Sequence, residues 1–270
     1  METLCKEFAR QARIDVIKIL HRSKDSHVGT CFSCLDILAV LYNAVLNIDP
    51  KNPDMEDRDI FIMSKGHGAA ALYSTLARRG YFPAELLESY CKVGSDLAGH
   101  VRKFVVPGVD CSAGSLGHGL SLATGIGYAN RLKGSPGRVF VLMGDGECNE
   151  GSVWEAAMLA AYHKLSNIVA IVDRNRLQSY NSDEKVLGMG DIGEKFRAFG
   201  WRTADISGHD IPALISTLQT ACSKEPAPPL AVIAHTIKGK GVSYMENKLE
   251  WHFKSPNDEE LEIGLRELMK

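Results

Sequence analysis

Two oxygen-bearing side chains, Asp145 and Asn175, stand at positions where a metal-bound phosphate could be held. Asp145 lies in Gly144-Asp-Gly-Glu147, directly after an apolar run, and Asn175 follows the next apolar run along the chain. Magnesium prefers hard oxygen ligands and usually completes its octahedron with phosphate and water. We therefore predict that Asp145 and Asn175 bind Mg²⁺ and, through it, a diphosphate group.

Each segment alone has a simpler interpretation. Gly-Asp-Gly is a common turn, and Asp173-Arg-Asn175 could be a capped loop. Together they are more specific, because neighbouring parallel strands bring their carboxyl ends to one edge of a sheet, where such sheets bind ligands.

The elements that must position these residues are predicted from the apolar pattern. The first half reads as helices and loops, with amphipathic stretches near 4–20, 35–46 and 69–79. From Arg138, short apolar runs alternate with helical segments, which predicts an α/β fold with a doubly wound, mostly parallel sheet and helices on both faces. The predicted strands are Val139–Met143, Ile168–Asp173, Trp201–Ile206 and Leu230–Ala234, and the predicted helices between them are Val153–Leu165, Ile192–Phe199 and Ile211–Cys222.

The paired Asp145 and Asn175 motif resembles the fingerprint of the thiamine-diphosphate enzymes. Other segments, spread from about residue 5 to 258, make the chain similar to the transketolase family. They are Asp25-Ser-His27-Val-Gly29, Ser64-Lys-Gly-His67-Gly68, Gly99-His100, Ala113-Gly-Ser-Leu-Gly-His-Gly119, Glu150-Gly151 with Trp154-Glu155-Ala156, and His235-Thr-Ile-Lys-Gly-Lys-Gly241 followed by Trp251-His252.

The resemblance implies a role for each matching residue. Asp145, Asn175 and the carbonyl of Leu177 would bind Mg²⁺, and Glu150 would lie at a subunit interface in a proton relay. The residues implied to contact thiamine diphosphate are His67, Gly114, Leu116, Gly144, Asp145, Gly146, Glu147, Asn175 and Leu177. The imidazoles implied to surround the reacting carbons are His27, His67, His100 and His252.

Histidine suits this chemistry for a reason independent of the family. Making and breaking a carbon–carbon bond beside hydroxyls requires proton transfers near neutral pH, and imidazole titrates there. His27, His67 and His100 stand out by their glycine-flanked settings. The histidines interpreted as structural or surface residues are His21, His118, His163, His209 and His235.

Composition limits the classes of partner. With 31 basic and 33 acidic residues the formal net charge is -2, so we expect no nucleic-acid or membrane surface. We also expect a cytoplasmic protein, since the N-terminal residues carry charges too frequently for a signal peptide. Seven scattered cysteines predict reduced thiols. Cys31 and Cys34 have the C-x-x-C spacing, with Cys34 just inside a helix that Ser33 could cap, but they are interpreted as buried or incidental thiols rather than a redox centre.

Length suggests a single α/β domain over residues 1–270, and the resemblance implies that it is a diphosphate- and magnesium-binding domain. Full transketolases continue into pyrimidine-binding and C-terminal domains, so the resemblance implies the N-terminal subunit of a split enzyme. It would act on sugar phosphates with a separate C-terminal subunit, in an α₂β₂ heterotetramer. The alternatives are a subunit of another thiamine-diphosphate enzyme, such as a 1-deoxyxylulose-5-phosphate synthase or a 2-oxo acid dehydrogenase, or a non-catalytic relative.

Two local features depart from the expected pattern. Ser179 stands where much of the family has an apolar residue against the thiazolium ring. Lys238 and Lys240 lie in a glycine-rich turn after a predicted strand; we favour solvated lysines there over the alternative of phosphate contacts.

Overall fold

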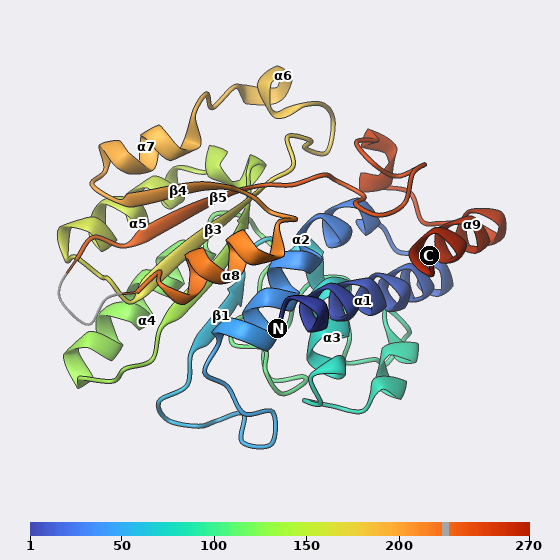
Figure 1. Ribbon diagram of the computed structural model, residues 1–270, viewed down its shortest axis with the longest axis horizontal. Coiled ribbons are helices and arrows are strands. Elements are labelled where there is room, and N and C mark those ends of the chain that lie inside the picture. Colours follow the sequence, from blue (N-terminus) through green and yellow to red (C-terminus); the bar gives the residue numbers. More distant parts are fainter. Residues whose placement is uncertain (223–226) are drawn as a thin grey trace.

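The computed structural model describes residues 1–222 and 227–270, and its centre is a parallel β-sheet between two layers of helices (Figure 1). The strand order is β1-β2-β3-β5-β4, so the predicted doubly wound parallel sheet is confirmed. The strands are β1 (Ile60–Met63), β2 (Val139–Gly144), β3 (Ile168–Arg174), β4 (Arg202–Ser207) and β5 (Leu230–His235).

Both faces of the central strands are buried, which explains their continuous apolar sequences. Along β2, Val139 and Val141 pack on one helical layer, while Phe140 and Leu142 pack on the other. The first layer contains α4 (Gly119–Lys133), α5 (Gly151–Tyr162) and α7 (Ile192–Ala198). The second contains α1 (Glu2–Ser23), α2 (Val28–Val40), α3 (Ala69–Arg78) and α8 (Ile211–Gln219), with α9 (Asp258–Leu268) against α1. The remaining short helices are η1 (Leu41–Val45), η2 (Gly66–Gly68), η3 (Ala84–Ser89), η4 (Gly146–Asn149), α6 (Asp183–Leu187) and η5 (Leu249–His252).

The prediction of helices and loops throughout the first half was wrong at β1. This strand pairs with β2 in parallel, with Ile60 opposite Val139, and it is only four residues long. The sequence prediction also placed a buried strand at 201–206. The observed β4 is one of the two edge strands of the sheet, and its side chains are half-buried or exposed.

One long apolar stretch belongs to the core. Residues 28–45 are long and apolar enough to cross a membrane, but 83% of this stretch is buried inside the fold. Because α2 already begins at Val28, Cys34 lies in the helix interior, and the predicted cap at Ser33 was wrong. Burial raises the pKa of Cys31 to about 12 and that of Cys34 to about 11, so these thiols stay protonated and buried.

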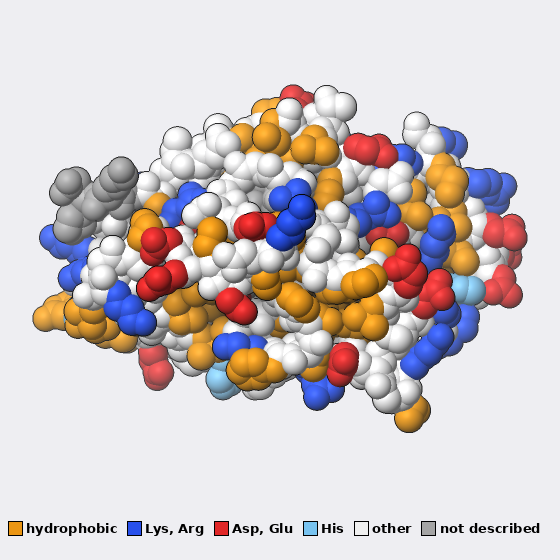
Figure 2. All heavy atoms as spheres, turned by 90° about the horizontal axis from the view of Figure 1, so that it is seen from below, with side chains coloured by type: hydrophobic (Ala, Val, Ile, Leu, Met, Phe, Trp, Pro, Cys, Tyr) orange, Lys and Arg blue, Asp and Glu red, His pale blue; other side chains and the backbone are white. Residues whose placement is uncertain are grey.

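Charged side chains of both signs are interspersed over the face shown in Figure 2. This agrees with the near balance of acidic and basic residues in the composition. A face of this kind lacks the one-sided positive field that attracts a polyanion.

Candidate active site

Asp145 follows β2, and two backbone amides hold its carboxylate. Gly146 N donates to one carboxylate oxygen at 2.8 Å, and Arg176 N donates to the other at 2.6 Å. Only 4% of Asp145 is exposed. Burial, together with the nearby carboxylate of Asp173, raises its pKa to about 6. A carboxylate removed from water in this way is stabilised by a bound cation.

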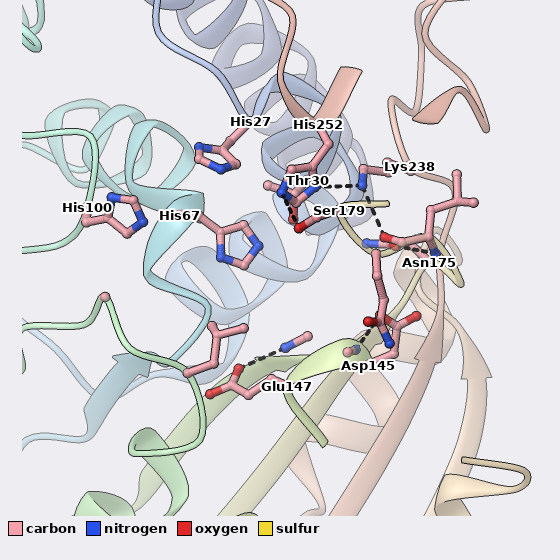
Figure 3. Close-up of a pocket in the computed structure, with 16 residues that line it drawn as sticks. His27, Thr30, His67, His100, Asp145, Glu147, Asn175, Ser179, Lys238 and His252 are labelled. Atoms are coloured by element: carbon pink, nitrogen blue, oxygen red, sulfur yellow. Dashed lines mark hydrogen bonds between the residues drawn. The ribbon is translucent and has the colours of Figure 1, made fainter. Parts of the chain in front are cut away.

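Asn175 reaches the same place from the neighbouring strand. β3 pairs with β2 in parallel, with Asp173 opposite Gly144, so the segments that follow these two strands leave the sheet side by side. The side-chain oxygen of Asn175 accepts a hydrogen bond from Leu177 N at 3.1 Å, which orients the amide. Asp145 and Asn175 lie together on one side of the pocket, away from His100 (Figure 3).

The pocket above these strand ends is a cavity of about 250 Å³. It brings together every predicted site residue except Glu150. These residues are His27, His67, His100, Gly114, Leu116, Gly144, Asp145, Gly146, Glu147, Asn175, Leu177 and His252. It also contains four residues that the sequence prediction did not assign to the site, Thr30, Gln178, Ser179 and Lys238.

Four imidazoles from separate segments form one cluster at this pocket (Figure 3). The ring of His27 lies 5.0 Å from that of His252, 5.3 Å from that of His67 and 5.8 Å from that of His100, between centroids. The backbone joins two of the segments, because His27 N donates to the carbonyl of His252 at 3.0 Å. The sequence motifs predicted these histidines as site residues, and the fold places their rings next to one another.

Three of these imidazoles are neutral at physiological pH. Burial lowers the pKa of His27 to about 4 and that of His252 to about 3, and it holds the pKa of His67 well below its usual value. A neutral imidazole offers one donor and one acceptor, which suits it to hold hydroxyl groups and to exchange protons with them.

Lys238 is buried in the pocket, so the interpretation of it as a solvated turn lysine was wrong. Its Nζ donates to the carbonyl of Leu177 at 3.1 Å and lies 3.0 Å from Nδ1 of His252. Burial, together with the charge of Lys65, lowers the pKa of Lys238 to about 8. Lys240 is partly exposed and lies 3.4 Å from Glu246, as expected of a turn lysine.

The two lysines differ because of the way their turn packs. Gly239 N donates to the carbonyl of Gly29 at 2.9 Å, which presses the turn onto the start of α2. A Cβ at Gly29 would lie 3.0 Å from Cγ of Lys238, so this glycine makes room for the lysine stem. The only available signal in the sequence was the alternation of lysine and glycine from His235 to Gly241.

Glu147 lines the pocket, but protein groups already engage its carboxylate. It accepts a short hydrogen bond from the hydroxyl of Ser64, and others from Gly117 N at 2.9 Å and Gly144 N at 3.1 Å. Burial raises the pKa of Glu147. Its visible role is to join three loops of the pocket wall, and cofactor contact by Glu147 stays a prediction.

Glu150 lies outside the pocket. It is exposed and precedes α5, with its side chain beside Gly117, where an added Cβ would come within 2.6 Å of Cβ of Glu150. The predicted role at a subunit interface requires an exposed residue, and the structure of one chain leaves it as a prediction.

A buried ion pair that the sequence prediction missed contacts Thr30, which lines the pocket. Lys65 and Asp173 are fully buried and form a close salt bridge. Lys65 also donates to the carbonyl of Thr30 at 3.0 Å, and Ser33 donates to Asp173 at 2.6 Å. The pair therefore links α2 to β3.

Comparison with known proteins decides the family. Residues 4–267 match the family model described as "Transketolase, thiamine diphosphate binding domain". The chain belongs to the transketolase family. The resemblance in the motifs is thus confirmed, and thiamine diphosphate is the cofactor that this family domain binds.

Similar transketolase chains of comparable length include two named as subunits. An apulose-4-phosphate transketolase subunit of Phocaeicola vulgatus is 40% identical over 253 residues, which cover 94% of this chain and 89% of that protein. The "6-deoxy-6-sulfo-D-fructose transketolase subunit SqwG" of Clostridium sp. is 37% identical over 244 residues, with 90% and 88% covered.

A solved transketolase shows the same fold within a longer chain. The structure of transketolase from Leishmania mexicana superimposes with a TM-score of 0.92 at 27% identity. The match covers 98% of this chain but only 41% of that one. The chain therefore spans about two fifths of this longer transketolase.

Proposed function

We propose that this chain is the N-terminal subunit of a split transketolase that uses thiamine diphosphate and Mg²⁺. Together with a separate C-terminal subunit in the cytoplasm, it transfers a two-carbon ketol unit from a ketose phosphate to an aldose. The observation that carries this proposal is the meeting of Asp145 and Asn175 with four imidazoles in one pocket.

The chemistry of the available donors fits the metal and the diphosphate. Asp145, Asn175 and the carbonyl of Leu177 supply hard oxygen atoms, and two of the three already have their orientation fixed by backbone hydrogen bonds. Lys238 adds a buried cation for the diphosphate, and Gly146 lines the same pocket. We assign Mg²⁺ to the three oxygens and the diphosphate to Lys238 and Gly146.

Bound thiamine diphosphate supplies the electron sink that allows a carbon–carbon bond beside a carbonyl to break and form. The chain's own residues orient the sugar and manage its protons. Ser26 Oγ lies 2.9 Å from Nδ1 of His27, which leaves Nε2 of that ring for a substrate hydroxyl. His67 and His100 extend the cluster, so that neighbouring hydroxyls of one sugar can each meet an imidazole.

A second subunit completes the site in this proposal. The relatives from Phocaeicola vulgatus and Actinobacillus succinogenes, each named as one subunit of an apulose-4-phosphate transketolase, support a separate partner chain. We propose an α₂β₂ assembly with Glu150 at an interface between subunits. The isolated chain is then expected to be nearly inactive.

Calorimetry tests this proposal by measuring how thiamine diphosphate binds to the complex of this chain with its partner subunit, with and without Mg²⁺. Asp145→Ala should abolish the magnesium-dependent binding. Asp205→Ala is the matched control, because this aspartate lies exposed on the edge strand and pairs with His235 at 3.2 Å. Unchanged binding in Asp145→Ala would exclude the assigned metal site.

Substrate consumption separates the remaining alternatives. A transketolase subunit should support turnover of a ketose phosphate plus an aldose and leave pyruvate untouched. Consumption of pyruvate would indicate another thiamine-diphosphate reaction. Cofactor binding without turnover of either substrate class would indicate a non-catalytic relative.

A further inference from the structure

The side-chain amide of Gln178 has a buried donor without a partner. Its Nε2 is shielded from solvent and makes no hydrogen bond to the residues that the structure describes. Among those described residues, Gln178 is the one pocket-lining residue with such an atom. Buried polar groups in folded proteins are nearly always hydrogen-bonded, so this donor indicates an acceptor supplied from outside the chain.

The position of this amide is fixed by its surroundings. Gln178 N donates to the carbonyl of Asn181 at 2.9 Å, and Leu177 forms an antiparallel bridge with Ser182, so the turn has a defined backbone. The side chain lies over Gly146, where an added Cβ would come within 2.9 Å of Cγ and Cδ and 3.2 Å of Nε2. The amide therefore faces the segment assigned to the diphosphate.

The nearby oxygen atoms of the chain already have other partners, and their remaining lone pairs are the ones assigned to Mg²⁺. Both carboxylate oxygens of Asp145 accept backbone hydrogen bonds, from Gly146 and Arg176. The oxygen of Asn175 accepts from Leu177 N, and the carbonyl of Leu177 accepts from Lys238. An N–H group is repelled by a metal cation but is attracted strongly by an anionic oxygen. A phosphate oxygen is thus the acceptor that fits this place.

We propose that Gln178 is a further cofactor-binding residue, whose amide donates a hydrogen bond to the diphosphate of thiamine diphosphate beside Gly146. This inference rests on the proposed function. It adds a neutral donor to the metal and to Lys238, and it acts on the diphosphate end of the cofactor alone.

Calorimetry on the complex of this chain with its partner subunit tests the inference, with Mg²⁺ present and either thiamine diphosphate or thiamine as the probe. Gln178→Leu should weaken thiamine diphosphate binding about 10- to 100-fold, the loss typical of a hydrogen bond to a charged group. Thiamine, which has no phosphate, should bind both proteins equally. Gln178→Glu is nearly the same size as the wild type and replaces the donor by an anion, so its affinity for thiamine diphosphate should fall at least as far. This variant tests the inference if Gln178→Leu does not fold.

Gln219→Leu is the matched control, because its Nε2 donates to the carbonyl of Ala44 at 3.0 Å on the exposed surface of α8, away from the pocket residues. Unchanged or tighter thiamine diphosphate binding in Gln178→Leu would overturn the inference, as would an equal loss for thiamine. If the wild-type complex does not bind thiamine diphosphate, the proposed function fails as well. If the wild-type complex binds thiamine diphosphate and the Gln178→Leu complex binds it equally well, only the role of Gln178 is refuted.

Discussion

Nζ of Lys238 lies 3.0 Å from Nδ1 of His252, and this contact fixes where the imidazole carries its proton. With a pKa of about 8, Lys238 is mostly an ammonium at neutral pH, and an ammonium can only donate. Nδ1 of His252 must therefore accept, so its proton resides on Nε2. Ser179 Oγ lies 3.1 Å from that Nε2 and accepts from it.

Lys238→Met should remove both the cation and this hydrogen bond. We expect thiamine diphosphate binding to weaken roughly 10- to 100-fold, because a charge-assisted contact to the diphosphate is lost. Lys240→Met is the control from the same turn, since Lys240 is partly exposed. Calorimetry with the partner subunit present measures both, and equal affinities for the two variants would contradict the assignment of Lys238.

The pocket histidines predict a stability that falls in mild acid. The pKa of His27 is about 4 and that of His252 about 3 in the folded chain, against 6.5 for an unperturbed imidazole. The unfolded chain therefore binds more protons below about pH 6.5. These two histidines therefore leave the free energy of unfolding unchanged above that pH and lower it as the pH falls from 6.5 towards 4.

Urea unfolding at pH 7 and pH 5 measures this dependence. For the two groups together we expect a loss of roughly 1 to 4 kcal/mol between these pH values, since each proton contributes about 1.4 kcal/mol per pH unit. The double variant His27→Gln, His252→Gln should lose less over the same interval. An identical loss in the double variant would show that other groups cause the acid sensitivity.

The buried pair of Arg13 and Asp36 should be important for stability. Its nitrogen and oxygen lie 2.7 Å apart, and Asp36 also lies 2.7 Å from Nδ1 of His209. Burial alone would raise the pKa of Asp36, but Arg13 and His209 outweigh burial and hold this pKa well below its usual value. The stabilisation is present above about pH 4 and disappears as the pH falls towards the folded-state pKa.

Asp36→Asn should lower the free energy of unfolding at pH 7 by about 3 kcal/mol, because it leaves a buried guanidinium without its counter-charge. The exposed pair of Arg10 and Glu7 offers the control, and Glu7→Gln should leave the free energy of unfolding nearly unchanged. Denaturant unfolding compares the two variants. Similar small losses would mean that the buried pair contributes little.

Gly66 should not tolerate a side chain. An added Cβ would lie 2.3 Å from the carbonyl oxygen of Ala113, in the glycine-rich loop of the pocket wall. Gly66→Ala should destabilise the fold by about 1 to 3 kcal/mol. Gly125→Ala, in an exposed and open position of α4, should instead stabilise it by about 0.5 to 1 kcal/mol. Thermal unfolding distinguishes these opposite signs.

Much of the sheet could be predicted from the sequence because buried parallel strands have a simple local signature. Continuous apolar runs identified β2, β3 and β5, and the residues directly after β2 and β3 carried the site motif. β1 was not predicted because a strand of four residues is too short to show a recognisable apolar pattern. α9 begins with a capping box between Asn257 and Glu260, a helix-start signal that is local in the sequence.

The sequence by itself determined which residue types are available, namely the strand-end Asp145 and Asn175 and the glycine-flanked histidines, because their settings are local in the chain. Only the tertiary structure decided which side chains lose their water. It buried Lys238 and left Lys240 partly exposed, although both occupy one turn, and it left the amide of Gln178 without a partner. Burial depends on which distant segment packs against a residue, and the spacing of neighbours along the chain does not encode that contact.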